Sequence, residues 1–225
     1  MRWWSHLWRS SAEELGEPLR QVRLALPGWR EDTPREGARI WRDVDGNVLA
    51  LDPWPGPFRH ANSTDERKIR KWCREVAESR SAGLIEAYAI EGGIRFIYKR
   101  LQEDAYVYTG MLITRVRKAW LVWTMVAGEQ GTTGVREAVV TADLMNQGKL
   151  TIDGYKKYWC QDPYEPAYRG ADRSVLRSMS DDERYDEKFP EHPLSKVRRL
   201  LATLPSHVEY YSPIVPSRSD GLIPG

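Results

Sequence analysis

Cysteine is nearly absent from this sequence. The chain has 225 residues but only two cysteines, Cys73 and Cys160. Two thiols exclude the disulfide framework of a small secreted domain and also exclude a cysteine-rich metal site. Sparse cysteine use is typical of proteins in a reducing compartment, so we expect a cytoplasmic protein.

Long apolar runs and an excess of one charge are missing too. No apolar stretch approaches the roughly 20 residues that a membrane-spanning helix needs, so we expect no membrane span. The 34 Lys and Arg residues against 32 Asp and Glu residues give a net charge of +2. A dedicated nucleic-acid-binding protein has a marked basic excess, so this near-balance argues against a nucleic-acid partner.

Histidine is scarce and scattered. The four histidines are His6, His60, His192 and His207, and none lies within four residues of another. No Cys-x-x-Cys motif is present, so the usual metal-ligand spacings are absent. We therefore expect no metal site and no cofactor, and we interpret the histidines as surface or helix-capping residues. Cys73 is expected to be a buried structural thiol.

Tryptophan and tyrosine are abundant, with 10 and 11 residues. Trp3, Trp4, Leu7 and Trp8 open the chain with a spacing that puts most of them on one side of a helix. This N-terminal aromatic arm, residues 1–19, either folds back on the domain or docks on another chain. Exposed apolar patches usually mark partners, so these four residues are the candidate partner-binding residues.

The middle of the chain, residues 20–148, has the pattern of an α+β domain. Short links between the strand-like runs exclude parallel crossovers, so these runs should form an antiparallel meander. The proline-rich segment 52–62 is expected to be a loop. The expected elements are a strand at 21–26, a hairpin of 38–42 and 47–51, a helix at 63–79, four strands at 84–90, 94–100, 105–113 and 119–126, and a helix at 134–147.

The last strand of the meander is apolar on both faces. Trp120 and Val122 alternate with Leu121, Trp123 and Met125. Such a sheet needs cover on both sides. We therefore expect Trp120 and Trp123 to point to opposite faces, with helices flanking the sheet. For the helix at 134–147, the spacing predicts that Val135, Ala138, Val139 and Ala142 share its buried side.

The remainder, residues 149–225, loses clean periodicity and is expected to pack on the domain as a C-terminal extension. A final helix is predicted at 193–203, because Pro193 suits a first turn. The carboxylates of 181–187 are interpreted as a solvated turn opened by Ser180. The basic run 196–199 is interpreted as a solvated face.

One combination of features extends over much of the middle of the chain: Leu26-Pro27-Gly28-Trp29, the following hairpin, the 63–79 helix and the entry to the last helix at 131–138. This combination resembles the PsbP-like superfamily. The resemblance covers about residues 20–147. It implies an α+β fold without a shared catalytic site. Members of this superfamily include small binding or chaperone-like adaptors, some of which bind apolar helices of partner proteins.

A glycine-rich loop, residues 128–134, precedes the helix at 134–147. Glycines let backbone N–H groups converge, and a helix N-terminus favours an anion. Gly131, Thr132, Thr133, Gly134 and Arg136 are therefore candidate anion-binding residues. The loop lacks the Lys-Ser/Thr pair of a P-loop. The alternative is a plain turn in which Thr132 or Thr133 caps the helix.

The sequence favours a non-enzymatic protein: a protein-binding adaptor, chaperone or immunity-type protein that uses a sheet face and the aromatic arm, with no catalytic residues. One alternative is an enzyme or a binder of a small anionic ligand at the 128–134 loop. It predicts a pocket with converging ionisable groups at 128–137. Another is a structural subunit that self-associates through Trp3, Trp4 or Trp8.

Overall fold

The computed structural model describes most of the chain beyond the N-terminal arm. The described residues are 18–32, 37–54, 58, 60, 63, 65–116 and 118–210. The predicted partner-binding residues Trp3, Trp4, Leu7 and Trp8 lie outside them, so their role stays a prediction.

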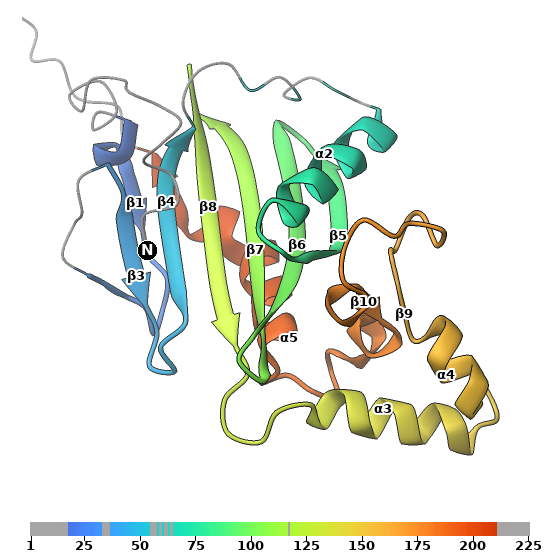
Figure 1. The fold of residues 1–225 in the computed structure, drawn as a ribbon. Coiled ribbons are helices and arrows are strands. Elements are labelled where there is room, and N and C mark those ends of the chain that lie inside the picture. The colour runs from blue at the N-terminus through green and yellow to red at the C-terminus, as the bar shows by residue number, and fades with distance from the viewer. Residues whose placement is uncertain are drawn as a thin grey trace, which may run out of the picture.

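A seven-stranded antiparallel sheet forms the centre of the molecule (Figure 1). Its strand order is β2-β3-β4-β8-β7-β6-β5. The strands are β2 (Arg30–Glu31), β3 (Arg39–Arg42), β4 (Val48–Trp54), β5 (Gly83–Ile90), β6 (Gly93–Gln102), β7 (Ala105–Val116) and β8 (Ala119–Gly128). The predicted hairpin is β3–β4 and the predicted meander is β5–β8, so the α+β class is confirmed. The sheet is larger than expected because β2 adds to the free edge of β3.

Strand β4 runs further than the prolines of 52–62 led us to expect. It continues through Pro53 to Trp54 by pairing with β8. Pairing with β3 ends at Leu51, which lies opposite Arg39. Proline is tolerated where no second strand needs its missing N–H, so β4 can extend as an edge strand at this end.

One helix packs on each face of the sheet. Helix α2 (Glu66–Glu78) buries Ile69, Cys73 and Ala77 and contacts β5 and β6. Helix α5 (Pro193–Thr203) lies on the opposite face against β7 and β8. Both helices were predicted from their spacing. Gly110 of β7 allows the close approach of α5, since a Cβ there would lie 2.5 Å from Val197 Cγ1.

The remaining elements lie at the sheet's margins. Two short sheets pair β1 (Val22–Leu24) with β11 (Val208–Tyr210), and β9 (Cys160–Gln161) with β10 (Arg177–Ser178). The strand predicted at 21–26 therefore exists as β1, but it pairs outside the large sheet. Further helices are α3 (Val135–Asn146), α4 (Ile152–Tyr158) and the 3-10 turns η1 (Arg173–Val175), η2 (Met179–Asp181), η3 (Glu183–Tyr185) and η4 (Leu204–His207). Among the described residues, no helix is long and apolar enough to cross a membrane.

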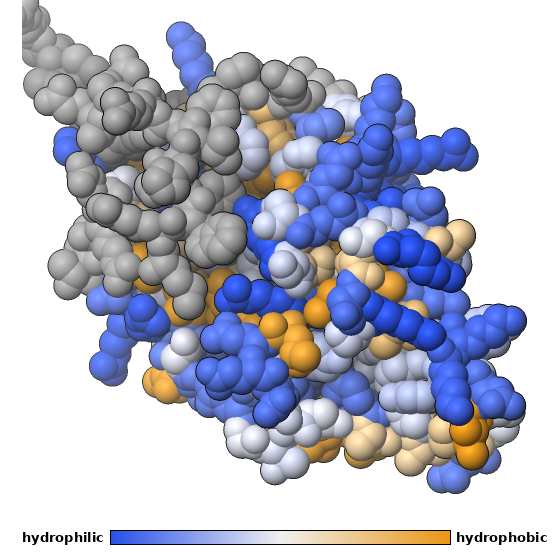
Figure 2. Space-filling model, viewed as in Figure 1, coloured by the Kyte–Doolittle hydropathy of each residue, from blue (hydrophilic) through white to orange (hydrophobic). Residues whose placement is uncertain are grey.

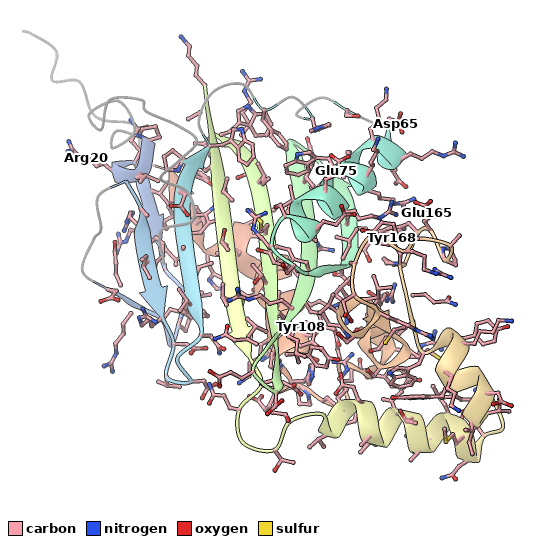
Figure 3. The ribbon with its side chains drawn as sticks, viewed as in Figure 1. Arg20, Asp65, Glu75, Tyr108, Glu165 and Tyr168 are labelled. Atoms are coloured by element: carbon pink, nitrogen blue, oxygen red, sulfur yellow. The ribbon has the colours of Figure 1, made fainter. Side chains whose placement is uncertain are left out.

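The chain after α3 is tied to α2 by charged and aromatic contacts. Arg74 of α2 donates two hydrogen bonds, each 2.9 Å long, to the buried carboxylate of Asp162 and a third to Glu165. The Tyr164 hydroxyl donates to the Ala87 carbonyl of β5. Figure 3 shows Glu165 and Tyr168 beside α2. These contacts hold part of the C-terminal extension against the same face as α2.

The two faces have separate cores, as the two-sided apolar pattern of β8 predicted. Trp123 is 1% exposed on the α5 face, where its ring lies 5.7 Å from that of Trp41. Trp120 is 8% exposed on the α2 face with Phe96 and Met111. The predicted opposition of the two tryptophans is therefore confirmed.

Truncating Trp123 tests this core. Trp123→Ala should lower the free energy of unfolding by about 3–5 kcal/mol, because it leaves a large cavity against Trp41. Urea denaturation followed by circular dichroism measures the loss. The exposed Val44, in the β3–β4 turn, is the control, and Val44→Ala should change stability by less than about 0.5 kcal/mol. Equal stability of the two variants would contradict the assignment of Trp123 to the core.

Candidate functional site

A buried ion pair lies between the sheet and the turn η2. Lys99 Nζ of β6 donates to Asp181 Oδ2 at 2.6 Å, and both side chains are almost fully buried. The sequence had placed Asp181 in a solvated turn, and that expectation is wrong. Burial alone raises the pKa of Asp181, but the Lys99 ammonium and hydrogen bonds from Ser178 outweigh it and hold the pKa below its ordinary value.

The Asp181 carboxylate is fully hydrogen-bonded. The backbone N–H and the hydroxyl of Ser178 both donate to Oδ2, at 2.8 and 2.9 Å. The Tyr108 hydroxyl of β7, labelled in Figure 3, donates to Oδ1 at 3.2 Å. These bonds explain why a carboxylate can be buried here, since an unsatisfied charge would be strongly destabilising.

Arg136 joins the buried network of hydrogen bonds and ion pairs around Asp181. Its guanidinium donates to the Ser180 carbonyl at 2.7 Å, to Ser195 Oγ at 2.9 Å and to Asp186 Oδ1 at 2.9 Å. Helix α3 buries Arg136, Val140 and Leu144. The expected apolar side of this helix is therefore wrong, because its Val135 is 45% exposed.

The basic run 196–199 also reaches the network. Arg198 is mostly buried, and its guanidinium donates to Glu86 Oε2 at 2.9 Å and to the Asp181 carbonyl at 2.6 Å. The interpretation of this run as a solvated face is wrong for Arg198. Period-3.6 spacing turns one member of such a run toward the sheet.

The carboxylate of Glu129, a residue of the glycine-rich loop, accepts hydrogen bonds from two backbone N–H groups. Glu129 Oε1 accepts from Gly134 N at 2.8 Å, and Glu129 Oε2 accepts from Tyr106 N at 3.0 Å. Gly134 is the N-cap of α3 with a φ of +71° and no side-chain cap, so Thr132 and Thr133 do not cap the helix. The Arg136 guanidinium is hydrogen-bonded to Ser180, Ser195 and Asp186. Of the candidate anion-binding residues, Thr132 and Arg136 line one cavity, whereas Gly131, Thr133 and Gly134 do not. Anion binding by these residues stays a prediction.

A cavity of about 430 Å³ opens beside this loop. Ionisable groups converge on it, as the ligand-binding alternative predicted for 128–137. Glu129 comes from the loop, and His192 and Lys196 come from the start of α5. The lining residues are Asp45, Asn47, Gly128, Glu129, Gln130, Thr132, Val135, Arg136, Lys188, Phe189, Pro190, Glu191, His192, Pro193 and Lys196.

His192 caps α5, and its side chain is only 8% exposed. Its Nδ1 accepts a hydrogen bond from Leu194 N at 3.2 Å. Its Nε2 is buried without a partner and lies 3.9 Å from Glu129 Oε1. Burial, with the nearby Arg136 charge, lowers the pKa of His192 to about 3. The imidazole is therefore neutral at pH 7.

Glu137 completes this group from α3. Its Oε1 accepts from Ser180 Oγ at 3.3 Å, whereas its Oε2 is buried without a partner. Burial, with the Asp181 charge, raises the pKa of Glu137. One potential ligand atom each from Glu129, Glu137 and His192 lies within 4.8 Å of the other two. Sequence reasoning missed this group because its members are 8 and 55 residues apart.

The α2 face of the sheet carries a second distinctive surface. Helix α2 packs on β5 and β6, whereas β3, β4 and β8 continue the face beyond it (Figure 1). The side chains there are half-buried and mostly apolar, and we call them the strip: Ile40, Val48, Ala50, Thr124 and Val126. Their positions follow from alternation, because Leu49, Leu51, Trp123 and Met125 point to the α5 core. Figure 2 looks at the molecule from the α2 side and shows hydrophobic groups scattered among charged groups around α2 and the elements after it.

The strip ends in an aromatic cluster. Phe58 lies at the centre of the cluster, with ring centroids 5.2 Å from Trp54, 5.3 Å from Trp72 and 5.2 Å from Trp120. Trp54 and Trp72 are only partly buried. The strip is thus continuous with aromatic surface, the kind of side chain that is enriched in protein interfaces.

Asp52 interrupts the strip between Ala50 and the aromatic cluster. It lies opposite Val122 of β8. Burial raises the pKa of Asp52 to about 6, and no other group contributes to the shift. Among the described residues it has no hydrogen-bond or ion-pair partner.

Comparisons with known proteins give distant similarities. No protein family matches the chain, and no curated protein matches its sequence. The Ran-binding protein Mog1p of Saccharomyces cerevisiae gives a TM-score of 0.37 at 8% identity, over 61% of this chain and 84% of that protein. A mutant of protein Mog1 gives 0.41 at 7% identity, over 84% and 90%. A protein from Bacteroides thetaiotaomicron gives 0.32 at 18% identity, over 51% and 41%. The PsbP-like resemblance stays a prediction.

Breaking the buried ion pair between Lys99 and Asp181 should strongly reduce the stability of the fold. Lys99→Met should lower the free energy of unfolding by about 3–5 kcal/mol, because Asp181 would keep a buried charge without its counter-ion. Lys188→Met is the control, since it breaks an exposed pair with Asp143 and should cost at most about 1 kcal/mol. Urea denaturation compares the two. Similar losses would show that Lys99 is not the counter-ion that Asp181 needs.

Asp52 should reduce stability at neutral pH. A carboxyl group whose folded pKa exceeds its unfolded value of about 3.9 favours the folded state only when protonated. The stability that protonation supplies is lost as the pH rises from about 4 to about 6. Asp52→Asn should therefore stabilise the protein by about 1–3 kcal/mol at pH 7.5 and have little effect at pH 3.5.

Urea denaturation at both pH values checks this prediction. Asp104→Asn, in the exposed β6–β7 turn, is the matched control and should change stability by less than about 0.5 kcal/mol at either pH. A loss of stability in Asp52→Asn at pH 7.5 would mean that Asp52 has a stabilising partner.

Proposed function

We propose that this chain is a non-enzymatic protein-binding adaptor whose strip receives an apolar segment of another protein. The observation that carries the proposal is the strip itself, a half-buried apolar sheet face that contains an unpaired carboxylate. Chaperone and immunity-type roles are finer forms of the same proposal.

The apolar character of the strip is the first support. An antiparallel sheet with one face in water normally has polar side chains on that face. Ile40, Val48, Ala50 and Val126 depart from this rule on strands that α2 does not cover. Apolar surface beyond the needs of the core commonly marks an interaction site.

The shape of the strip supports an extended or helical partner segment. The side chains that line it, on β3, β4 and β8, are all small or β-branched. Trp72 of α2, which is partly buried, lies at the end of the strip, with its ring centroid 6.1 Å from that of Trp54. Trp54 at its end offers an aromatic anchor, and aromatic anchors commonly contribute about 2 kcal/mol or more to binding.

Asp52 is the second support. A desolvated carboxylate without a partner destabilises the folded chain, and such groups cluster at functional sites. A donor in the partner, either an N–H group or a cationic side chain, would satisfy it in the complex. The PsbP-like resemblance, whose members include binding adaptors, agrees with this role. Under the proposal, Trp3, Trp4, Leu7 and Trp8 extend the binding surface.

Site-specific photo-crosslinking tests the proposal. A benzophenone amino acid replaces Ala50 or Thr124 in the strip, in cells that make the protein naturally. We expect each position to crosslink one and the same heterologous protein. Glu75, exposed on α2 and labelled in Figure 3, is the control position and should give no such product.

A second substitution distinguishes specific binding from chance contact. Val126→Asp in the strip should reduce the crosslink from Ala50 at least about tenfold, whereas Val44→Asp in the exposed turn should leave it unchanged. Equal yields from Ala50 and Glu75 would contradict the proposal. A product that contains only a second copy of this chain would favour self-association instead.

A further inference from the structure

We propose that Glu129, Glu137 and His192 form a binding site for a divalent transition-metal ion of the Zn²⁺ class, with an open coordination position toward the 430 Å³ cavity. The site lies on the α5 side of the sheet, away from the strip. Its three residues come from the 128–134 loop, from α3 and from the residue before α5.

Charge balance is the first argument. Each neighbouring acid of the network has a cation: Asp181 has Lys99, Asp186 has Arg136, and Asp45 and Glu191 share Lys196. Among the described residues, no Lys or Arg forms an ion pair with Glu129 or Glu137. Two neighbouring carboxylates without a counter-charge favour a bound cation.

Unused ligand atoms are the second argument. The His192 side chain is 8% exposed, and its Nε2 is buried, has no partner and faces Glu129. Glu137 Oε2 is also buried and unpartnered. Glu129 Oε1 accepts one hydrogen bond from Gly134 and keeps a second lone pair. Buried polar atoms without partners are rare, so two of them beside one carboxylate indicate a missing ligand.

The donor set selects the kind of metal. Mg²⁺ and Ca²⁺ prefer oxygen ligands throughout, whereas an imidazole nitrogen with carboxylate oxygens suits Zn²⁺ and similar ions. Bonds of about 2.0–2.2 Å place tetrahedral ligands about 3.4 Å apart. The 3.9 Å from His192 Nε2 to Glu129 Oε1 therefore needs only a small contraction. Three protein ligands leave a fourth position for water.

His192 gives the site a specific signature. Because Leu194 N donates to Nδ1, the proton of the neutral imidazole is on Nε2 in the metal-free protein. A metal ion can bind Nε2 only if this proton moves to Nδ1, which breaks the hydrogen bond from Leu194. Metal binding should therefore change the His192 tautomer and the Leu194 amide together.

Calorimetric titration of the metal-free full chain with ZnCl₂ tests the site. We expect saturable binding of one ion, weakened about 10–100-fold or more by Glu137→Gln or His192→Asn. Controls are His207→Asn, a half-buried histidine elsewhere, Glu191→Gln at the cavity mouth and Cys160→Ser, which removes the nearest thiol. The controls should stay within about threefold of the parent.

Nitrogen NMR of the same samples supplies an independent readout. The ring nitrogens of His192 should exchange protonated and unprotonated shifts on addition of Zn²⁺, and the Leu194 amide should move with them. Absence of saturable binding up to about 1 mM free Zn²⁺ would overturn the proposal and leave a bridging water as the occupant. Equal weakening by the controls, or an unchanged His192 tautomer, would overturn it as well. None of these results depends on the strip.

Discussion

Lys99 and Asp181 meet in the interior, and much of the surrounding structure follows from that contact. Removing each charge from water costs several kcal/mol. The ion pair with Lys99 does not offset this loss of hydration alone. The carboxylate of Asp181 also accepts hydrogen bonds from Ser178 and Tyr108. The turn η2 is therefore held over β6 and β7 by the ion pair and by these hydrogen bonds.

Two helices are hydrogen-bonded to η2. The carbonyl of Ser180 accepts from Arg136 of α3, and the carbonyl of Asp181 accepts from Arg198 of α5. Both guanidinium groups also bond Asp186. Arg136 is thereby turned inward, away from the glycine-rich loop. Within the loop, the Glu129 carboxylate accepts a hydrogen bond from the backbone N–H of Gly134. The cavity lies between that loop and the start of α5.

The parts of the fold that depend on local pattern could be predicted from the sequence. Helix α5 begins at Pro193 and buries its apolar side as expected, and the strands of the meander follow their short links. The ion-pair network could not be predicted, because its partners Lys99 and Asp181 are 82 residues apart. Asp181 stands in a run of charges, and a local pattern cannot show which single member is buried.

Some residues of the two candidate sites could be predicted from the sequence, and others could not. A pocket at 128–137 was one stated alternative, and Glu129 lies within that range. His192 was interpreted as a surface or capping residue; it does cap α5, but nothing local indicates that Nε2 faces two carboxylates. The two-sided apolar pattern of β8 predicted cover on both faces. It could not show that α2 would make most of its sheet contacts with β5 and β6.

Strand β8 connects the two surfaces while keeping them separate. Thr124 and Val126 of β8 belong to the strip, whereas Trp123 and Met125 point into the α5 core. The strand then ends at Gly128, beside the cavity. Because side chains alternate with period two, one strand can serve a binding face and a cavity without sharing a side chain between them. Trp123 and Met125 are tightly packed, and close-packed interiors resist small displacements. A partner on the strip would therefore contact β8 without moving Glu129, so the two surfaces can carry independent roles in one small domain.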